Sequence, residues 1–164
     1  MNKHVAGLTI VELMIAMAVI AVVVSLGVPH LPGVVGNNRL TAQVNTLSNH
    51  LAYARSEAVK SGTPVTVTSN NGAIWQDGWT VWVDTNNSGL MDAGEELRIG
   101  EAFGAASVLT PDNGTDFITY NGTGALAGNP VTFTLCNTSS PYGKQLKITG
   151  SGRGRLADSK YKCP

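Results

Sequence analysis

The sequence predicts an α+β protein in which one long N-terminal helix packs on antiparallel β-sheet. Three observations favour this class. An apolar run covers residues 8–28, and apolar side chains then recur at helical spacing as far as Lys60. Beyond Gly62 the apolar period changes to two, which is the period of β-strands. The chain has neither internal repeats nor the strand–helix alternation of parallel sheets, so its strands are expected to be antiparallel.

The first predicted element is the apolar helix. Residues 1–7 form a short leader that contains one Lys and ends at Gly7, and the 21 residues from 8 to 28 hold only three polar side chains, Thr9, Glu12 and Ser25. As a helix this run spans roughly 30 Å, the thickness of one bilayer core. A secretory signal has a shorter run and a cleavage site after it, whereas here the small residue comes first.

The carboxylate of Glu12 lies at the start of this apolar run. An ionisable group in such a segment is costly and is a functional hypothesis by default. It needs a partner when it is buried in a bilayer or in a bundle of apolar helices. The alternative is an ordinary membrane helix with one carboxylate near its end.

Residues 29–61 are predicted to continue as an amphipathic helix. Pro29 and Pro32 are expected to kink the helix rather than to end the pattern. One apolar stripe with alternating steps of four and three residues then follows: Leu40, Val44, Leu47, Leu51, Ala54 and Ala58. Polar side chains such as Arg39 and Gln43 fall off this stripe. Gly62 followed by Pro64 predicts the helix end.

Residues 62–164 are predicted to be rich in β-structure. Six strands are expected, at 65–68, 79–83, 97–99, 117–120, 131–135 and 146–148, and clusters of Gly, Asn, Asp and Pro separate them. Trp75 is expected in a turn that precedes the second strand. The three Trp residues favour packing in the core and in hairpins, and a ligand platform is the alternative.

The cysteine count indicates a disulfide. The chain has two cysteines, Cys136 and Cys163, and only 13% of its residues are charged. An even count in an exported chain favours a bond between them, with two unpaired thiols as the alternative. Closing this loop of about 28 residues would stabilise the C-terminal segment by roughly 3–4 kcal/mol.

The charge is distributed unevenly along a chain whose formal net charge is zero. Residues 8–143 hold four basic side chains against ten carboxylates. Residues 144–164 hold six basic side chains against Asp158 alone, and these six are Lys144, Lys147, Arg153, Arg155, Lys160 and Lys162. Such asymmetry indicates a nucleic acid or another anionic partner.

The segment Gly152-Arg153-Gly154-Arg155 is the strongest candidate within this tail. Glycines allow the backbone to approach a surface closely, and each Arg presents a planar fork of donors that matches phosphate oxygens. The lysines Lys144, Lys147, Lys160 and Lys162 would add charge nearby if the disulfide holds the segment together. The pattern predicts salt-sensitive contact with the backbone of double-stranded DNA, because no aromatic ladder for stacking on single strands is evident. A solvated hairpin whose arginines balance the acidic remainder is the alternative.

Residues 84–95 have the spacing of a calcium-binding loop. Oxygen-bearing side chains fall at loop positions 1, 3, 5, 9 and 12, and the backbone carbonyl of position 7 completes the pattern. The corresponding residues are Asp84, Asn86, Ser88, Leu90, Asp92 and Glu95. Strands rather than helices flank this loop, and a polar turn is the alternative interpretation.

Enzymatic chemistry finds little support, and no cofactor other than calcium is predicted. His4 lies in the leader, and His30 and His50 lie in the predicted helix without a nucleophile motif beside them. The sequence has no Cys/His cluster with metal-ligand spacing and no phosphate-binding glycine loop before a helix.

The segment Gly7-Leu8-Thr9-Ile10-Val11-Glu12 resembles the Gly-Phe-Thr-Leu-Ile-Glu motif of type IV pilins and type II secretion pseudopilins, with Leu8 in the place of the usual Phe. The resemblance implies that a prepilin peptidase cuts after Gly7 and methylates the new N-terminus at Leu8. The helix 8–28 would then anchor the chain once in the bacterial inner membrane, with a periplasmic head of residues 29–164. It would later enter the core of a pilus or pseudopilus filament. Glu12 would pair with the α-amine of a neighbouring subunit.

Three further stretches resemble the FimT/GspH group of minor pilins and pseudopilins. They are residues 37–40 with 54–60, the segment from Gly78 to Glu95, and residues 151–155. The resemblance implies a type IV pilin-like fold, in which a long N-terminal helix packs on antiparallel sheets. A Gly-Arg-x-Arg ending of the FimT type is associated with DNA capture in natural transformation, and residues 152–155 match it. The alternative is a structural minor pilin, or a GspH-like pseudopilin for type II secretion, without DNA binding.

Overall fold

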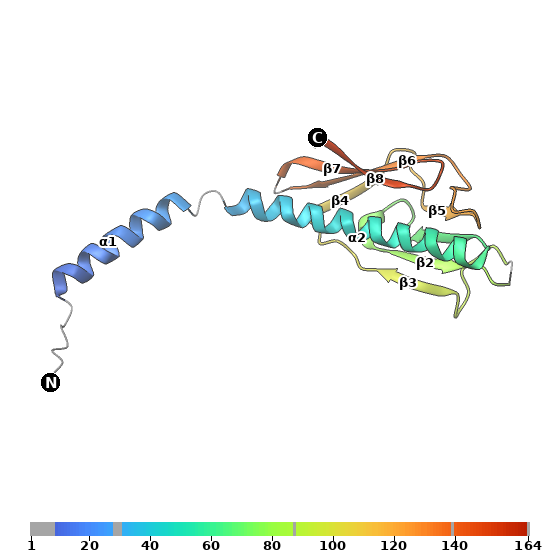
Figure 1. The fold of residues 1–164 in the computed structure, drawn as a ribbon, viewed down its shortest axis with the longest axis horizontal. Helices are drawn as coiled ribbons and strands as arrows, with labels where there is room; N and C mark the ends of the chain where they lie inside the picture. The colour runs from blue at the N-terminus through green and yellow to red at the C-terminus, as the bar shows by residue number, and fades with distance from the viewer. Residues whose placement is uncertain (1–8, 28–30, 87, 139, 164) are drawn as a thin grey trace. The chain divides into compact units, whose positions relative to one another are not determined.

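The computed structural model describes residues 9–27, 31–86, 88–138 and 140–163, without the side chains of 26–27, 31–34 and 158–160. The chain divides into two compact units, residues 1–35 and 36–164, and each is described by itself. Helix α1, Ile10–Gly27, belongs to the first unit (Figure 1). Its described side chains are all exposed, including large apolar ones such as Ile10 and Met14.

The predicted membrane segment 8–28 begins and ends outside the described residues. Within the part of the chain that the structure covers, no helix combines the length and the apolarity needed to cross a bilayer. Pro29 also lies outside the described residues.

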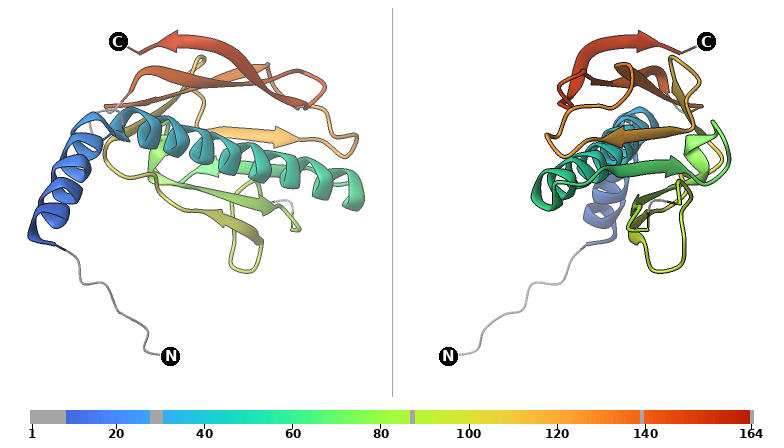
Figure 2. Two further views of the ribbon diagram at one scale, coloured as in Figure 1. Left: turned by 60° about the vertical axis from the view of Figure 1, so that its left-hand side comes forward. Right: turned by 90° about the vertical axis from the view of Figure 1, so that its right-hand side faces the viewer.

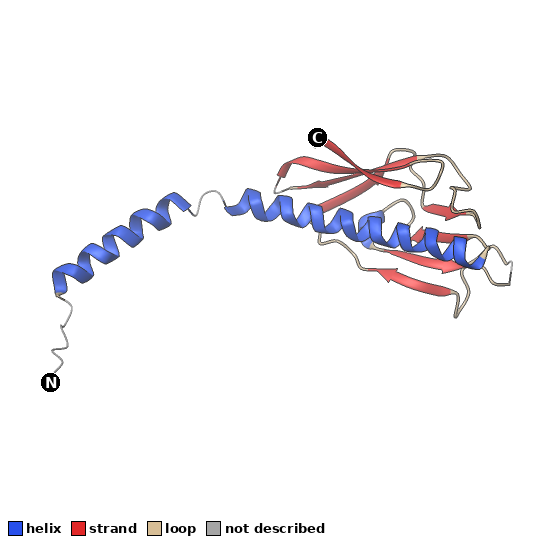
Figure 3. Ribbon diagram, viewed as in Figure 1, coloured by secondary structure: helices blue, strands red, loops and turns tan. Residues whose placement is uncertain are grey.

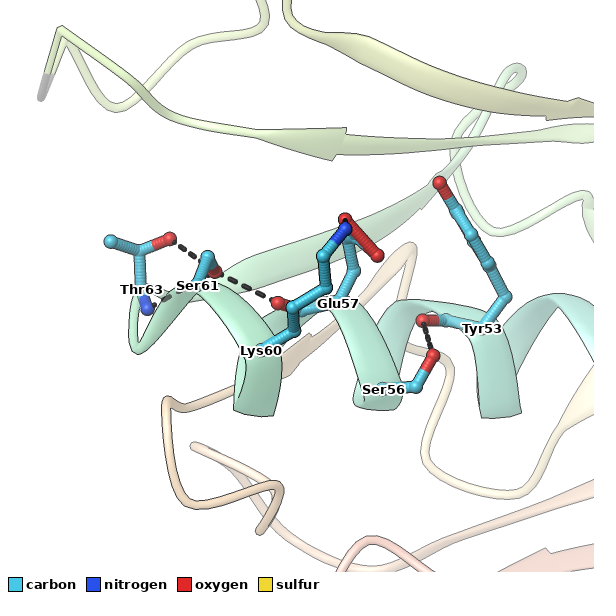
Figure 4. Close-up of polar contacts among 6 residues, drawn as sticks. All are labelled: Tyr53, Ser56, Glu57, Lys60, Ser61 and Thr63. Carbon is cyan, nitrogen blue, oxygen red and sulfur yellow. Dashed lines mark hydrogen bonds and ion pairs between the residues drawn. The ribbon is translucent and has the colours of Figure 1, made fainter.

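Helix α2, Leu31–Ser61, carries the predicted apolar stripe. All six stripe residues are at most 2% exposed, which confirms the helical spacing. Pro32 is the second residue of α2, where the missing N–H of proline removes no helical hydrogen bond. The helix ends at Ser61, whose hydroxyl donates to the carbonyl of Glu57, and Gly62 follows at a φ of 69° (Figure 4).

The first sheet has the strand order β3-β2-β1-β5, and its described pairings are antiparallel. Its strands are β1, Val65–Ser69; β2, Trp79–Val83; β3, Glu96–Gly100; and β5, Phe117–Tyr120. The predicted segments agree with all four strands to within a residue at each end. Trp75 lies in a short 3-10 turn, Trp75–Asp77, directly before β2.

The second sheet has the order β4-β6-β7-β8 and is also antiparallel. Its strands are β4, Ser107–Pro111; β6, Val131–Asn137; β7, Ser140–Ile148; and β8, Gly154–Lys162. β4 and β8 are absent from the sequence prediction, and β7 begins six residues earlier than predicted. Both missed strands lie at the edges of the sheet (Figures 1 and 3).

One core joins α2 to both sheets, and Figure 2 shows α2 lying where the two sheets come together. Trp75 and Trp79 are fully buried and Trp82 is 8% exposed, which confirms that the Trp residues pack in the core. A buried polar network was not predicted. The Ser107 hydroxyl donates to the Gln43 side chain and accepts from the Asn137 amide. Gln43 is therefore buried, although it falls off the apolar stripe, because β4 supplies it with a partner.

Candidate nucleic-acid interface

The Gly-Arg-Gly-Arg segment forms the turn between β7 and β8 and the start of β8. The turn is closed by two backbone hydrogen bonds, from Thr149 N–H to the Arg153 carbonyl at 3.0 Å and from Gly152 N–H to the Thr149 carbonyl at 2.8 Å. Gly152 has a φ of 76°, and a Cβ atom there would collide with the Gly124 carbonyl oxygen. The turn therefore needs glycine at position 152 for two separate reasons.

Three cations next to this turn point into solvent. Arg153 in the turn and Arg155 in β8 are exposed, and Arg155 lies directly across from Lys147 of β7. The neighbours Leu146 and Ile148 are fully buried, so Lys147 and Arg155 occupy the outer face of the sheet. We refer to Lys147, Arg153 and Arg155 as the basic cluster.

The other lysines of the tail lie elsewhere. Lys162 pairs in register with Tyr142, five residues along β7 from Lys147, which is a distance of about 16 Å. Lys144 is half-buried and pairs in register with Leu135, a core residue, so it lies on the inner face of the sheet. The side chain of Lys160 lies outside those that the structure describes. The structure thus places Lys144 and Lys162 apart from the basic cluster.

The disulfide between Cys136 and Cys163 is present, which confirms the prediction. It links β6 to the residue that follows β8, at the end of the hairpin remote from the turn. The bond therefore fastens the C-terminus and does not gather lysines around residues 152–155.

Among the described residues, the one ion pair is that of Lys60 with Glu57 on α2, at 2.9 Å (Figure 4). The hydrogen bond that Lys60 Nζ donates to the Glu57 carboxylate raises the pKa of Lys60. No described carboxylate forms such a pair with the basic cluster. The charge of the basic cluster is therefore not balanced by an ion pair within the described residues.

A hollow of about 370 Å³ lies beside the turn, and sequence reasoning did not find it. We call it the Arg55 groove. Its walls include Ser48, Ala52 and Arg55 of α2, Tyr120 of β5 and the turn residues 152–154. The Arg55 Nε donates to the Gly124 carbonyl at 2.8 Å, and this is the same carbonyl that excludes a side chain at Gly152. The signal in the sequence was Arg55 itself, a cation within the helix signature of residues 54–60.

The predicted calcium loop closes on itself. Asp84 accepts the backbone N–H groups of Ser88 and Gly89, while Asp92 accepts from the Asn86 amide and the Ser88 hydroxyl. Glu95 is 3% exposed and accepts from Asp92 N–H, Thr85 N–H and the Thr85 hydroxyl, and these bonds lower its pKa. Within the described residues, no group of three acidic, His or Cys side chains is placed to hold a metal ion.

Of the three predicted processing residues, Glu12 lies within the described part of the chain. Gly7 and Leu8 lie outside the described residues. The hydroxyl of Thr9 accepts the Glu12 N–H at 3.2 Å, which is the contact of an N-cap residue with the third helical residue. Glu12 is exposed in the first turn of α1.

An N-terminal apolar helix followed by an amphipathic helix on two antiparallel sheets defines the class of pilin-like filament subunits. Residues 43–152 match the family model described as Type II transport protein GspH, and residues 2–28 match the prokaryotic N-terminal methylation motif. The chain belongs to the GspH family. Its members are structural, and the family implies contacts with other pilins or pseudopilins and processing by prepilin peptidase. The family and the motif indicate a membrane-anchored filament component.

Solved structures show the same fold. The type IV minor pilin FimU of Pseudomonas aeruginosa in space group P21 is 26% identical with a TM-score of 0.68, over 77% of this chain and 94% of that chain. Its P65 form is 22% identical with a TM-score of 0.64, over 75% and 96%. The minor pseudopilin EpsH from the type 2 secretion system of Vibrio cholerae is 14% identical with a TM-score of 0.58, over 73% and 96%. No curated protein matches the chain in sequence.

Proposed function

We propose that this protein is a minor type IV pilin that binds double-stranded DNA through its basic cluster and serves DNA uptake in natural transformation. The subunit is inserted once in the bacterial inner membrane with its head in the periplasm, and it then enters a filament. It is a binding subunit and not an enzyme. The match to the GspH family ends at residue 152, so the proposal for Arg153 and Arg155 depends on their own chemistry.

One observation carries the proposal: Lys147 and Arg155 face each other across two strands, next to Arg153, without a described carboxylate partner. Like charges directly opposite each other destabilise a sheet, so the pair costs stability in the free protein. A row of phosphates would relieve this repulsion and would match the donor forks of both arginines. Contacts of this kind bind DNA without reading its sequence.

The test is binding of duplex DNA by the full-length chain in a non-ionic detergent, at several salt concentrations. Arg153→Ala combined with Arg155→Ala is expected to reduce the slope of log affinity against log salt by about 2, because two phosphate contacts are lost. Arg39→Ala combined with Lys60→Ala removes the same charge from exposed positions on α2 and is expected to leave the slope unchanged.

Equal losses in the two double variants would mean that only overall charge matters. Absence of binding by the wild-type chain at low salt would overturn the proposal. The chain would then be a structural minor pilin, or a pseudopilin for type II secretion, and its basic cluster would contact another subunit.

A further inference from the structure

The Arg55 groove carries an inference beyond the basic cluster. It opens beside the Gly152–Gly154 backbone, so Arg153 lines the groove as well as belonging to the cluster. Its volume of about 370 Å³ is that of a small-ligand site rather than of a packing defect. Its lining residues include two arginines and no carboxylate.

The guanidinium of Arg55 is held in place at one side. Its Nε donates to the Gly124 carbonyl, which leaves the two terminal nitrogens without a partner among the described residues. Glu57, two residues along α2, lies on a different side of the helix and is paired with Lys60. Arg55 is therefore a cation of fixed orientation with unused hydrogen-bond donors, which is what an anion-binding site requires.

Tyr120 supplies the second, independent observation. The residue is 0% exposed, it lines the groove, and its hydroxyl is the one buried side-chain polar atom in the described chain that has no hydrogen-bond partner. Strand β5 buries Ile118 and Tyr120 on the face toward the core, so the ring points toward α2. Burial raises the pKa of Tyr120 well above its usual value, so the hydroxyl keeps its proton and acts as a donor.

The polar side chains of the groove are all hydrogen-bond donors. Arg55, Arg153 and the Tyr120 hydroxyl each have a hydrogen to donate, and the groove offers no negative charge to receive one. A phosphate oxygen is an acceptor only and is negatively charged, so it complements all three.

We propose that the Arg55 groove binds one phosphate of the DNA backbone, with Arg55, Arg153 and the Tyr120 hydroxyl as donors. The inference rests on the proposed function and deepens it, because it makes the basic turn one wall of a shaped phosphate site. The phosphate in the groove holds the duplex against the head, and the basic cluster contacts the next phosphates along the same DNA strand.

Two variants test the groove without touching either arginine. Tyr120→Phe removes the unpaired hydroxyl and keeps the ring, so the melting temperature is expected to stay equal or to rise. Affinity for duplex DNA is expected to fall about tenfold, because a hydrogen bond to a charged group is lost. The matched control is Tyr161→Phe, at an exposed position near the disulfide, with affinity unchanged.

Ala52→Glu places a carboxylate at an exposed position of the groove wall. It is expected to weaken DNA binding by about tenfold or more through like-charge repulsion. Ala42→Glu makes the same charge change at another exposed position of α2 and is expected to change affinity by less than about threefold.

Three results would overturn the inference, and they are distinguishable. If Tyr120→Phe and Ala52→Glu bind as the wild type does while the double arginine variant fails, the basic cluster binds DNA and the groove does not. If the wild type binds no DNA, the proposed function fails and the inference fails with it. If Ala52→Glu blocks filament incorporation and leaves DNA affinity unchanged, the groove receives an acidic group of another pilin.

Discussion

Two glycine-containing connections carry a functional sequence pattern: the turn between β7 and β8, and the loop of residues 84–95. They differ in whether their charged side chains are bound within the protein. In the loop, Asp84, Asp92 and Glu95 accept hydrogen bonds from the loop itself. In the turn, Arg153 stays exposed and unpaired among the described residues. The comparison shows that a ligand-binding sequence pattern is a weak guide where its side chains already form hydrogen bonds within the protein.

The packing of the turn offers the largest test of this comparison. Gly152→Ala adds a Cβ where φ is 76° and where the Gly124 carbonyl stands. Strain and overlap together are expected to lower the free energy of unfolding by about 2–4 kcal/mol. The loss is measured by urea unfolding.

Two control variants separate the causes in Gly152→Ala. Gly114 has a φ of 66° and open space around it. Gly114→Ala should therefore lower the free energy of unfolding by the backbone strain alone, about 1 kcal/mol. Gly150 has neither a positive φ nor a close neighbour, so Gly150→Ala should change the free energy of unfolding little. A loss in Gly152→Ala no greater than that in Gly114→Ala would show that the turn is not pressed against Gly124.

The closure of the loop predicts a pH dependence at Glu95. Its pKa is lowered in the folded chain, chiefly by the Asp92 N–H, so the unfolded chain takes up the proton first as the pH falls. The stability that Glu95 contributes is therefore complete above pH 4.5, its ordinary pKa, and is lost as the pH falls below that value. Glu95→Gln should lower the melting temperature by roughly 5 °C at pH 7 and by less near pH 3.

The neighbouring residue provides the control for Glu95. Glu96 is exposed, and Glu96→Gln is expected to leave the melting temperature unchanged at both pH values. A pH-independent difference between Glu95→Gln and the wild type would contradict a structural role for the ionised carboxylate.

The smallest expected effect is that of calcium on the loop. Because the carboxylates accept internal hydrogen bonds, millimolar calcium is expected to shift the melting temperature by less than about 1 °C. Differential scanning fluorimetry with and without a chelator measures this shift. A rise of several degrees that Asp84→Asn abolishes would show that calcium displaces the internal bonds, and the contrast between the loop and the turn would disappear.

Several elements of the fold followed from local patterns. The spacing of apolar residues from Leu40 to Ala58 located the buried face of α2. The predicted first and last residues of β2 and β5 are those of the structure. These patterns succeed because helices and strands have fixed periods and bury apolar side chains regularly. The disulfide followed from the count of two cysteines, which leaves one pairing.

The two missed strands show where local patterns fail. In β4 the buried positions include Ser107, which is satisfied by Gln43 and Asn137 from distant parts of the chain. β8 is polar along most of its length and forms because β7 offers it an edge to pair with. Neither reason is visible in a window of neighbouring residues.

The candidate site divides in the same way. The sequence by itself determined which residue types are present: a basic tail with two arginines between glycines, a loop with calcium-like spacing, and an apolar N-terminus with Glu12. Only the tertiary structure decided that Lys147 stands opposite Arg155, that Lys144 and Lys162 lie elsewhere, and that Arg55 and Tyr120 meet the turn. The physical reason is that charge and hydrogen-bonding capacity belong to each residue, whereas their availability depends on partners brought close by packing across long sequence distances.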